Sequence, residues 1–146
     1  MSRSFGNGVK LVWGCESFGP GFGQGLDELD SAAALDALAA FGITELDTAR
    51  IYGDGEAEPA LGAALASSAA AFDVATKAHP KFSLEHDALL EQVSTSLAAL
   101  GADSVGILYL HSPDPNAVLE GALGAVNELH KDGKIREFGL SNVGAQ

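Results

Sequence analysis

The stretch VGILYLH, residues 105–111, decides the fold class. Apart from one glycine it is a continuous apolar run that ends on a histidine. A run of this length without polar alternation is typical of a parallel strand that is covered on both faces. Alanine- and leucine-rich segments precede and follow it, and both have the spacing of amphipathic helices. The stretch therefore predicts a strand of an α/β protein, in which helices connect parallel strands.

The same alternation of short strands and longer helices extends along the chain on both sides of this stretch. Strands are predicted over residues 9–14, 44–49, 72–78, 105–111 and 135–142, and helices over residues 26–42, 56–67, 84–101 and 116–133. Pro59 is tolerated in the first turn of the second helix, Ser83 is expected to cap the third, and Gly101 to end it. Five strands separated by four helices predict a parallel sheet with right-handed crossovers.

The apolar spacing within the helices predicts which side chains are buried. These are Leu35, Leu38 and Phe41 in the first helix, Leu90, Val93, Leu97 and Leu100 in the third, and Leu119, Ala122, Leu123 and Val126 in the fourth. At the start of the second helix, Glu56 and Glu58 are most simply explained by the favourable interaction of negative charge with a helix N-terminus.

Two architectures fit this order of elements: a doubly wound open sheet, or part of an eight-stranded (β/α)8 barrel of TIM type. Polar side chains stand at the carboxyl ends of successive strands, where both architectures place their active sites. They are Asp47, Lys77, His111, Ser141 and Asn142. No Gly-x-Gly-x-x-Gly turn follows the first strand, which argues against a dinucleotide-binding open sheet. The barrel is therefore favoured.

The composition indicates a globular domain and disfavours several classes of partner. The chain has 146 residues, 47% of them hydrophobic, which is enough for one domain with a substantial core. Twenty acidic residues against eight basic ones give a net charge of -12, which repels nucleic acid and anionic membranes. Cys15 is the only cysteine, so we expect no disulfide framework and a reducing, cytoplasmic location. The N-terminus has no long apolar run, so neither signal peptide nor membrane span is expected.

Three of the strand-end side chains, Asp47, Lys77 and His111, can be combined into one reaction site with Tyr52, which lies five residues after Asp47. A lysine ammonium beside a phenol would stabilise the phenolate, and a paired aspartate would hold the lysine. A histidine could donate a hydrogen bond to a carbonyl oxygen beside the phenol. Such a site suits protonation of a carbonyl oxygen while hydride arrives from a cofactor. Taken singly, each residue has a structural alternative, such as packing of a tyrosine at the rim.

No metal site is predicted from the histidines. His79, His86 and His130 show no spacing that would pair them as ligands. His130 lies near a helix C-terminus, where a partial positive charge is favourable in any case. We therefore discount these three histidines as metal ligands.

Four stretches share their order and spacing with one known family. They are LDTARIYGDGEAEPALG (46–62), VATKAHP (74–80), STSLAALGADSVGILYLHSPD (94–114) and GKIREFGLSN (133–142). Together they resemble the aldo-keto reductase family, and most closely its aflatoxin-aldehyde reductase branch. The first strand, in WGCESFG (13–19), resembles the family less closely, with Cys15 where a small hydroxyl residue is common.

The resemblance implies a (β/α)8 barrel that reduces aldehydes or ketones, with NADPH as the cofactor. It implies a catalytic tetrad of Asp47, Tyr52, Lys77 and His111. In that tetrad Tyr52 would be the general acid, Lys77 and Asp47 would tune it, and His111 would orient the substrate carbonyl. The expected partner is a small carbonyl compound, with no nucleic acid, membrane or metal.

Two further residues match the resemblance at the end of the fifth strand. Ser141 and Asn142 correspond to the family's Ser-Asn pair, which hydrogen-bonds the nicotinamide carboxamide. A barrel of this type needs about 250 residues. Residues 1–146 are therefore expected to form a single partial domain that holds strands one to five with four connecting helices and lacks strands six to eight.

An arc of five strands leaves two sheet edges and an inner face open. Three explanations stay open for it: a fragment of a longer reductase, a shortened gene model, or a natural half-barrel that pairs with another half. The pairing could be a homodimer or could involve the missing C-terminal half. Two functions therefore stay open, an NADPH-dependent reductase completed by a C-terminal half and a catalytically silent module that associates through its sheet edges.

Overall fold

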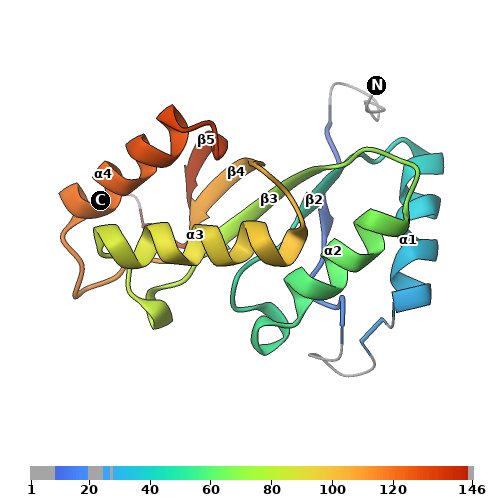
Figure 1. Cartoon of the computed structure of the whole chain (residues 1–146), viewed down its shortest axis with the longest axis horizontal. Helices are drawn as coiled ribbons and strands as arrows, with labels where there is room; N and C mark the ends of the chain where they lie inside the picture. The colour runs from blue at the N-terminus through green and yellow to red at the C-terminus, as the bar shows by residue number, and fades with distance from the viewer. Residues whose placement is uncertain (1–8, 20–24, 27, 145–146) are drawn as a thin grey trace.

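Five parallel strands and four α-helices alternate along the part of the chain that the structure describes (Figure 1). The computed structural model describes residues 9–19, 25–26 and 28–144. The strands are β1 (Trp13–Gly14), β2 (Glu45–Asp47), β3 (Asp73–Ala78), β4 (Val105–Leu110) and β5 (Ile135–Leu140). The α-helices are α1 (Glu28–Phe41), α2 (Ala57–Ser67), α3 (His86–Leu100) and α4 (Leu119–Lys131), and two short 3-10 helices are η1 (Tyr52–Gly55) and η2 (Pro80–Phe82).

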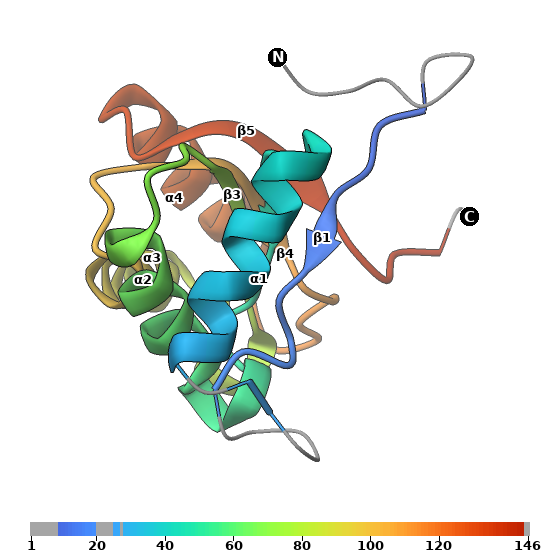
Figure 2. The ribbon, with the colours of Figure 1, turned by 90° about the vertical axis from the view of Figure 1, so that its right-hand side faces the viewer.

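The strands lie in the order β1-β2-β3-β4-β5, and every neighbouring pair is parallel. Consecutive helices pack against each other, α1 on α2, α2 on α3 and α3 on α4. Figure 2 shows the helices gathered on one side, with β1 on the other. A doubly wound sheet would have helices on both faces. The observed winding in one direction is that of an arc of a (β/α)8 barrel, so the predicted class, with five strands and four helices, is confirmed.

The first two strands are shorter than predicted. The segment 9–14 was expected to form a strand, but only Trp13 and Gly14 pair with β2, and both are exposed. An edge strand has a hydrogen-bonding neighbour on one side only, which explains its short length here. The expectation that no signal peptide is present rests partly on residues 1–8, which lie outside the described residues.

The core lies between the outer face of the sheet and the helices. Side chains that alternate along a strand point to opposite faces. On the outer face, Leu46 and Leu108 are fully buried, and Leu61 of α2 and Leu89 of α3 complete the same cluster. None of the helices among the described residues combines the length and apolar character needed to cross a bilayer.

The buried face of α4 differs from the prediction. Leu119 and Leu123 were expected in the core but are 59% and 43% exposed. Ala122 and Val126 are buried as predicted, together with Ala125 and Leu129. Small alanine side chains allow close approach of helix α4 to its neighbours α3 and β5, so the alanine face packs inward and two leucines remain outside.

Two other helix predictions were wrong in detail. Phe41, expected in the core, is 65% exposed at the last residue of α1. Ser83 was expected to cap the third helix, but α3 begins at His86 with Glu85 at the N-cap position. The Ser83 hydroxyl oxygen accepts a hydrogen bond from the Glu85 backbone N–H at 3.1 Å, so it shapes the turn before the helix.

Replacement of Gly62 by alanine is expected to destabilise the fold by about 1–3 kcal/mol, because the added carbon overpacks a helix interface. A Cβ at Gly62 of α2 would lie 2.3 Å from the backbone oxygen of Ala99 in α3, so the two helices would have to separate. Urea unfolding measures the loss. The matched control is Gly121→Ala in α4, where the nearest heavy atom to a new Cβ is 3.9 Å away. An equal effect of both substitutions would contradict the predicted helix contact.

Candidate active site

The ends of strands β2, β3 and β4 bring four polar side chains together. Asp47 is the last residue of β2, Lys77 lies near the end of β3 and His111 directly follows β4. The parallel ladder continues beyond the strands, because the Arg50 N–H bonds to the Lys77 carbonyl and the His111 N–H bonds to the Ala78 carbonyl. All four candidates, Tyr52 included, therefore lie at the carboxyl end of the sheet, where barrel enzymes place their active sites.

Lys77 is a buried cation with two fixed partners. Its side chain is 9% exposed, and Nζ lies 2.5 Å from Asp47 Oδ2. The same ammonium donates to the Thr48 backbone oxygen at 2.8 Å. A buried charge is tolerated only when it is paired and hydrogen-bonded. These two bonds hold the ammonium at one position at the carboxyl end of the sheet.

Tyr52 is held over this ammonium by a tight turn. It begins η1, in which Gly53, Asp54 and Gly55 all have positive φ angles. Two of the three are glycines, which adopt this backbone conformation without steric cost. The turn places the Tyr52 ring so that its centroid is 4.9 Å from Lys77 Nζ. A phenol in that position can give up its proton with the resulting negative charge beside a fixed ammonium.

His111 also lies beside the Tyr52 ring. The centroids of the Tyr52 and His111 rings are 5.6 Å apart, and the rings are nearly perpendicular. Burial lowers the pKa of His111, and the positive charges of Lys77 and His79 lower it further, against the opposing charge of Asp47. The neutral imidazole is thus favoured, and a neutral ring has one N–H that can donate to a carbonyl oxygen.

His79 belongs to the same group of rings, although from the sequence it was considered only as a metal ligand and was discounted. Its centroid is 5.0 Å from that of His111. Its Nδ1 accepts a hydrogen bond from the Lys81 N–H at 3.0 Å, so in the neutral ring the proton is on Nε2. The sequence contained a signal for it, because His79 follows Lys77 by two residues and alternate residues of an extended chain share a face.

Ser141 and Asn142 lie beside the His111 segment at the end of β5. The Ser141 N–H bonds to the Leu110 carbonyl. Asn142, with a φ of 57°, donates from Nδ2 to the His111 carbonyl at 2.8 Å and to Ser141 Oγ at 3.2 Å. The structure therefore places both residues next to the segment that carries His111.

Glu58 is the other residue whose environment differs from expectation. It was explained by the preference of negative charge for a helix N-terminus, but it is 1% exposed. Thr76 Oγ1 donates to its Oε1 at 2.5 Å. No sequence pattern indicated this contact, because it joins residues 18 positions apart on two different elements. Within the part of the chain that the structure describes, no group of three or more histidine, cysteine, aspartate or glutamate side chains could hold a metal ion.

Cys15 follows β1, and its backbone N–H bonds to the Asp47 carbonyl. Its thiol is expected to be unreactive. It is fully buried, and burial together with the nearby charge of Asp47 raises the pKa of the thiol to about 12. Since the thiolate is the reactive form, iodoacetamide at about pH 8 should leave the folded protein unmodified and should label the urea-unfolded protein rapidly. Mass spectrometry measures both reactions. Equal labelling rates in the two states would contradict the buried position.

The comparisons with known proteins agree with this arrangement of residues. A sequence profile described as the Aldo/keto reductase family matches residues 10–146. The chain belongs to the aldo-keto reductase family. It is 41% identical over 128 residues to human aflatoxin B1 aldehyde reductase member 4, and 43% identical over 113 residues to the oxidoreductase sirO of Leptosphaeria maculans. These alignments cover 84% and 76% of the chain.

Solved aldo-keto reductases have the same fold over nearly the whole chain. A thermostable aldo-keto reductase, solved with the inhibitor epalrestat, superposes with a TM-score of 0.81 and 28% identity over 94% of the chain. An aldo-keto reductase from Klebsiella pneumoniae, solved in complex with NADPH, superposes with a TM-score of 0.77 and 27% identity over 90% of the chain. The resemblance to aldo-keto reductases inferred from the four sequence stretches is thus confirmed.

The chain spans only part of these relatives. The alignments cover 39% of human aflatoxin B1 aldehyde reductase member 4 and 34% of sirO. They cover 51% of the thermostable reductase and 45% of the Klebsiella enzyme. The described sheet therefore corresponds to about half of a complete aldo-keto reductase barrel.

Proposed function

We propose that this chain supplies the proton-transfer half of an NADPH-dependent reductase of aldehydes or ketones. In this role Tyr52 is the general acid, Lys77, held in place by Asp47, stabilises the phenolate that remains, and His111 orients the carbonyl oxygen. One observation carries the proposal: the Lys77 ammonium, paired with Asp47 at 2.5 Å, lies 4.9 Å from the centre of the Tyr52 ring. This arrangement matches the negative charge that develops when a phenol donates its proton.

The cofactor fits the polar residues at the end of β5. NADPH supplies hydride when it is bound. Ser141 and Asn142 offer hydroxyl and amide groups, which suit the nicotinamide carboxamide, and Asn142 is tied to His111 through the bond to the His111 carbonyl. In the proposal, these two residues orient the nicotinamide, and Tyr52 gives its proton to the carbonyl oxygen as hydride reaches the carbonyl carbon. The product is an alcohol.

The experiment that tests the proposal restores a complete barrel. A chimera joins residues 1–142 of this chain to the remainder of human aflatoxin B1 aldehyde reductase member 4, and NADPH oxidation is followed with an aldehyde substrate. Turnover is expected. In parallel, NADPH binding to the 146-residue chain is measured by quenching of Trp13, its single tryptophan. A folded chimera that binds NADPH without reducing any aldehyde or ketone would contradict the proposed role of the site.

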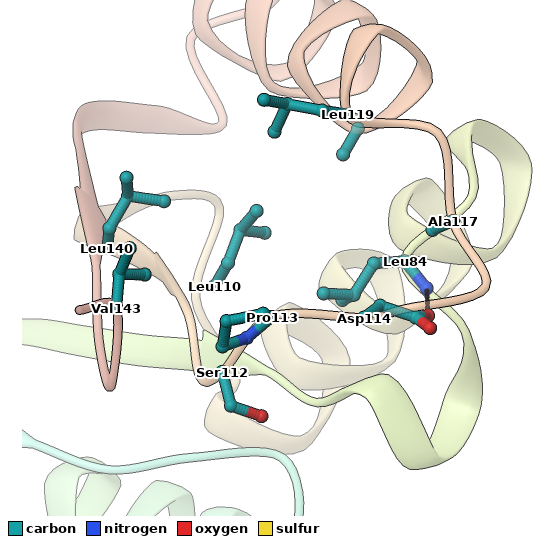
Figure 3. Close-up of a pocket in the computed structure, with 10 residues that line it drawn as sticks. Leu84, Leu110, Ser112, Pro113, Asp114, Ala117, Leu119, Leu140 and Val143 are labelled. Atoms are coloured by element: carbon teal, nitrogen blue, oxygen red, sulfur yellow. Dashed lines mark hydrogen bonds between the residues drawn. The ribbon is translucent and has the colours of Figure 1, made fainter. Parts of the chain in front are cut away.

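A second candidate function, as an association module, is favoured by open edges and exposed apolar side chains. In the described sheet, β1 and β5 each pair with one strand only. A hollow of about 300 Å³ lies on the helix-bearing side of β4 and β5, and most of the residues around it are apolar. Figure 3 shows Leu140 and Val143 on one wall, Leu119 above, and the loop with Ser112, Pro113 and Asp114 below. Leu119, Leu140 and Val143 are all more than half exposed.

In this second function, the partner is another half-barrel, either a second copy or a C-terminal half of the family. Light scattering on the purified chain measures the association, and Leu140→Lys is expected to weaken it, because a charge at a buried contact is costly. A monomer at all concentrations would exclude the homodimer. The treatment of residues 1–146 as one partial domain and the cytoplasmic location stay predictions.

A further inference from the structure

Glu58 is a buried carboxyl group that the proposed reaction does not use. It lies in the first turn of α2, and its Oε1 accepts a hydrogen bond from Thr76 Oγ1. Its Oε2 is also buried and has no hydrogen-bond partner among the described residues. A carboxyl group with one satisfied oxygen is costly to bury. Such a residue calls for an explanation beyond the ordinary charge preference of a helix N-terminus.

The bond to Thr76 joins the two segments that carry Tyr52 and Lys77. Thr76 immediately precedes Lys77 in β3, so the Lys77 side chain points to the inner face of the sheet and the Thr76 side chain to the helices. Tyr52 begins the turn that leads directly into α2, and the Glu56 N–H bonds to the Tyr52 and Gly53 carbonyls. Through Glu58, the end of the turn is fastened to the strand that carries the ammonium.

The beginning of the same turn is fastened separately. The Arg50 N–H bonds to the Lys77 carbonyl at 3.1 Å, two residues before Tyr52. The turn is thus attached to β3 at both ends, by a backbone bond before Tyr52 and by a side-chain bond after it. Between these two attachments, Gly53, Asp54 and Gly55 have positive φ angles. A turn that relies on glycine has little conformational preference of its own.

We propose that Glu58 is a positioning residue, which holds Tyr52 at contact distance from Lys77 by binding the Thr76 hydroxyl from the far side of the sheet. This inference rests on the proposed function for its catalytic meaning. The geometric claim, that the Tyr52–Lys77 contact depends on Glu58, stands on the structure alone. It also predicts that the acceptor oxygen of Glu58 matters and that its negative charge does not.

The surroundings of Glu58 shift the balance of its carboxyl group toward the neutral form. Burial raises the pKa of Glu58, while the hydrogen bond from Thr76, the nearby Ser96 hydroxyl and the charges of Arg50 and Lys77 oppose part of this effect. Glutamine keeps the acceptor oxygen, so Glu58→Gln is the conservative variant and Glu58→Leu removes the bond.

The test is an NMR measurement on the 146-residue chain. The contact is followed as the nuclear Overhauser effect between the Tyr52 ring protons and the Lys77 ε-methylene protons. Four variants are compared with the unaltered protein: Glu58→Gln, Glu58→Leu, Thr76→Val and Val126→Ala. The last is a control, because Val126 is buried in α4, away from the site, and its truncation lowers stability without touching the turn.

We expect the Tyr52–Lys77 signal to persist in Glu58→Gln and Val126→Ala, and to be lost in Glu58→Leu and weakened in Thr76→Val. A purely structural role would lower the melting temperature in Glu58→Leu but leave the signal intact, and that result overturns the inference. Should Glu58→Leu not fold, the nearly isosteric Thr76→Val decides in the same way. The same Glu58→Leu substitution in the chimera separates the two proposals. If the Tyr52–Lys77 signal were lost while aldehyde turnover stayed unimpaired, Glu58 would position Tyr52 as proposed, but the proposed catalytic role of the Tyr52–Lys77 contact would be wrong.

Discussion

Replacement of Tyr52 by phenylalanine is expected to lower the turnover of a completed barrel by about 10²–10⁴-fold, the usual contribution of a general acid. The substitution removes one hydroxyl group and keeps the ring. The contacts of the ring with Lys77 and His111 involve its face and edge, so they should survive. Binding of NADPH should change little, because the predicted carboxamide contacts come from β5. The measurement is steady-state aldehyde reduction by the chimera with residues 1–142.

Tyr109 provides the matched control for this prediction. It is the only other tyrosine and lies opposite Lys77 in the neighbouring strand, on the same face of the sheet. Its ring packs against the backbone of Gly139, so Tyr109→Phe keeps the packing and loses only the hydroxyl group. Turnover of Tyr109→Phe should remain near that of the unaltered chimera. Equal losses in the two variants would show that the phenol of Tyr52 has no special role.

Replacement of Asp47 by alanine is expected to lower the free energy of unfolding by about 2–4 kcal/mol, because it leaves the buried Lys77 ammonium without its anionic partner. Only 9% of the Lys77 side chain is exposed, so water cannot replace the lost carboxylate fully. The Thr48 carbonyl would remain as the other hydrogen-bond acceptor. Asp47 itself is 31% exposed, which places the expected loss somewhat below that of a fully buried pair. Urea unfolding of the 146-residue chain measures the change.

A double substitution separates the cost of the unpaired charge from other effects of the mutation. In Asp47→Ala/Lys77→Met, the buried charge is removed together with its partner, so stability should recover much of the single-variant loss. Asp103→Ala, at an exposed aspartate before β4, is the control for loss of a surface carboxylate and should change stability by less than about 0.5 kcal/mol. A stability loss of that same small size for Asp47→Ala would contradict a buried, paired Lys77.

The helix and strand order was predictable because each element carries its own local signal. Residues 105–111 form a strand over almost the predicted range, and α3 buries Val93, Leu97 and Leu100 of the expected stripe. The length of the edge strand β1 was overestimated, because strand propensity does not reveal whether a segment has a hydrogen-bonded neighbouring strand on each side. The buried face of α4 was predicted incorrectly at Leu119 and Leu123, because side-chain hydrophobicity does not reveal how closely two helices can approach.

For the candidate site, the sequence predicted which residue types are present and that they lie at strand ends. The spacing of the motifs predicted the family. The distances came from the folded chain. Asp47 and Lys77 are 30 residues apart in sequence and 2.5 Å apart in space, since their strands are neighbours in the sheet. Two members of the site were missed. His79 had a signal in its spacing from Lys77, whereas Glu58 had none.

By itself, the sequence determined the alternation of strands and helices, the parallel sheet and the membership of the aldo-keto reductase family. Hydrophobic periodicity and motif spacing can be read along the chain without knowing which elements pack against each other. Only the tertiary structure decided which faces are buried and which charges are paired. These depend on contacts between elements far apart in the chain, such as Thr76 with Glu58 and Lys77 with Asp47. The same physical reason explains the open edges of β1 and β5, since pairing is a property of neighbours in space.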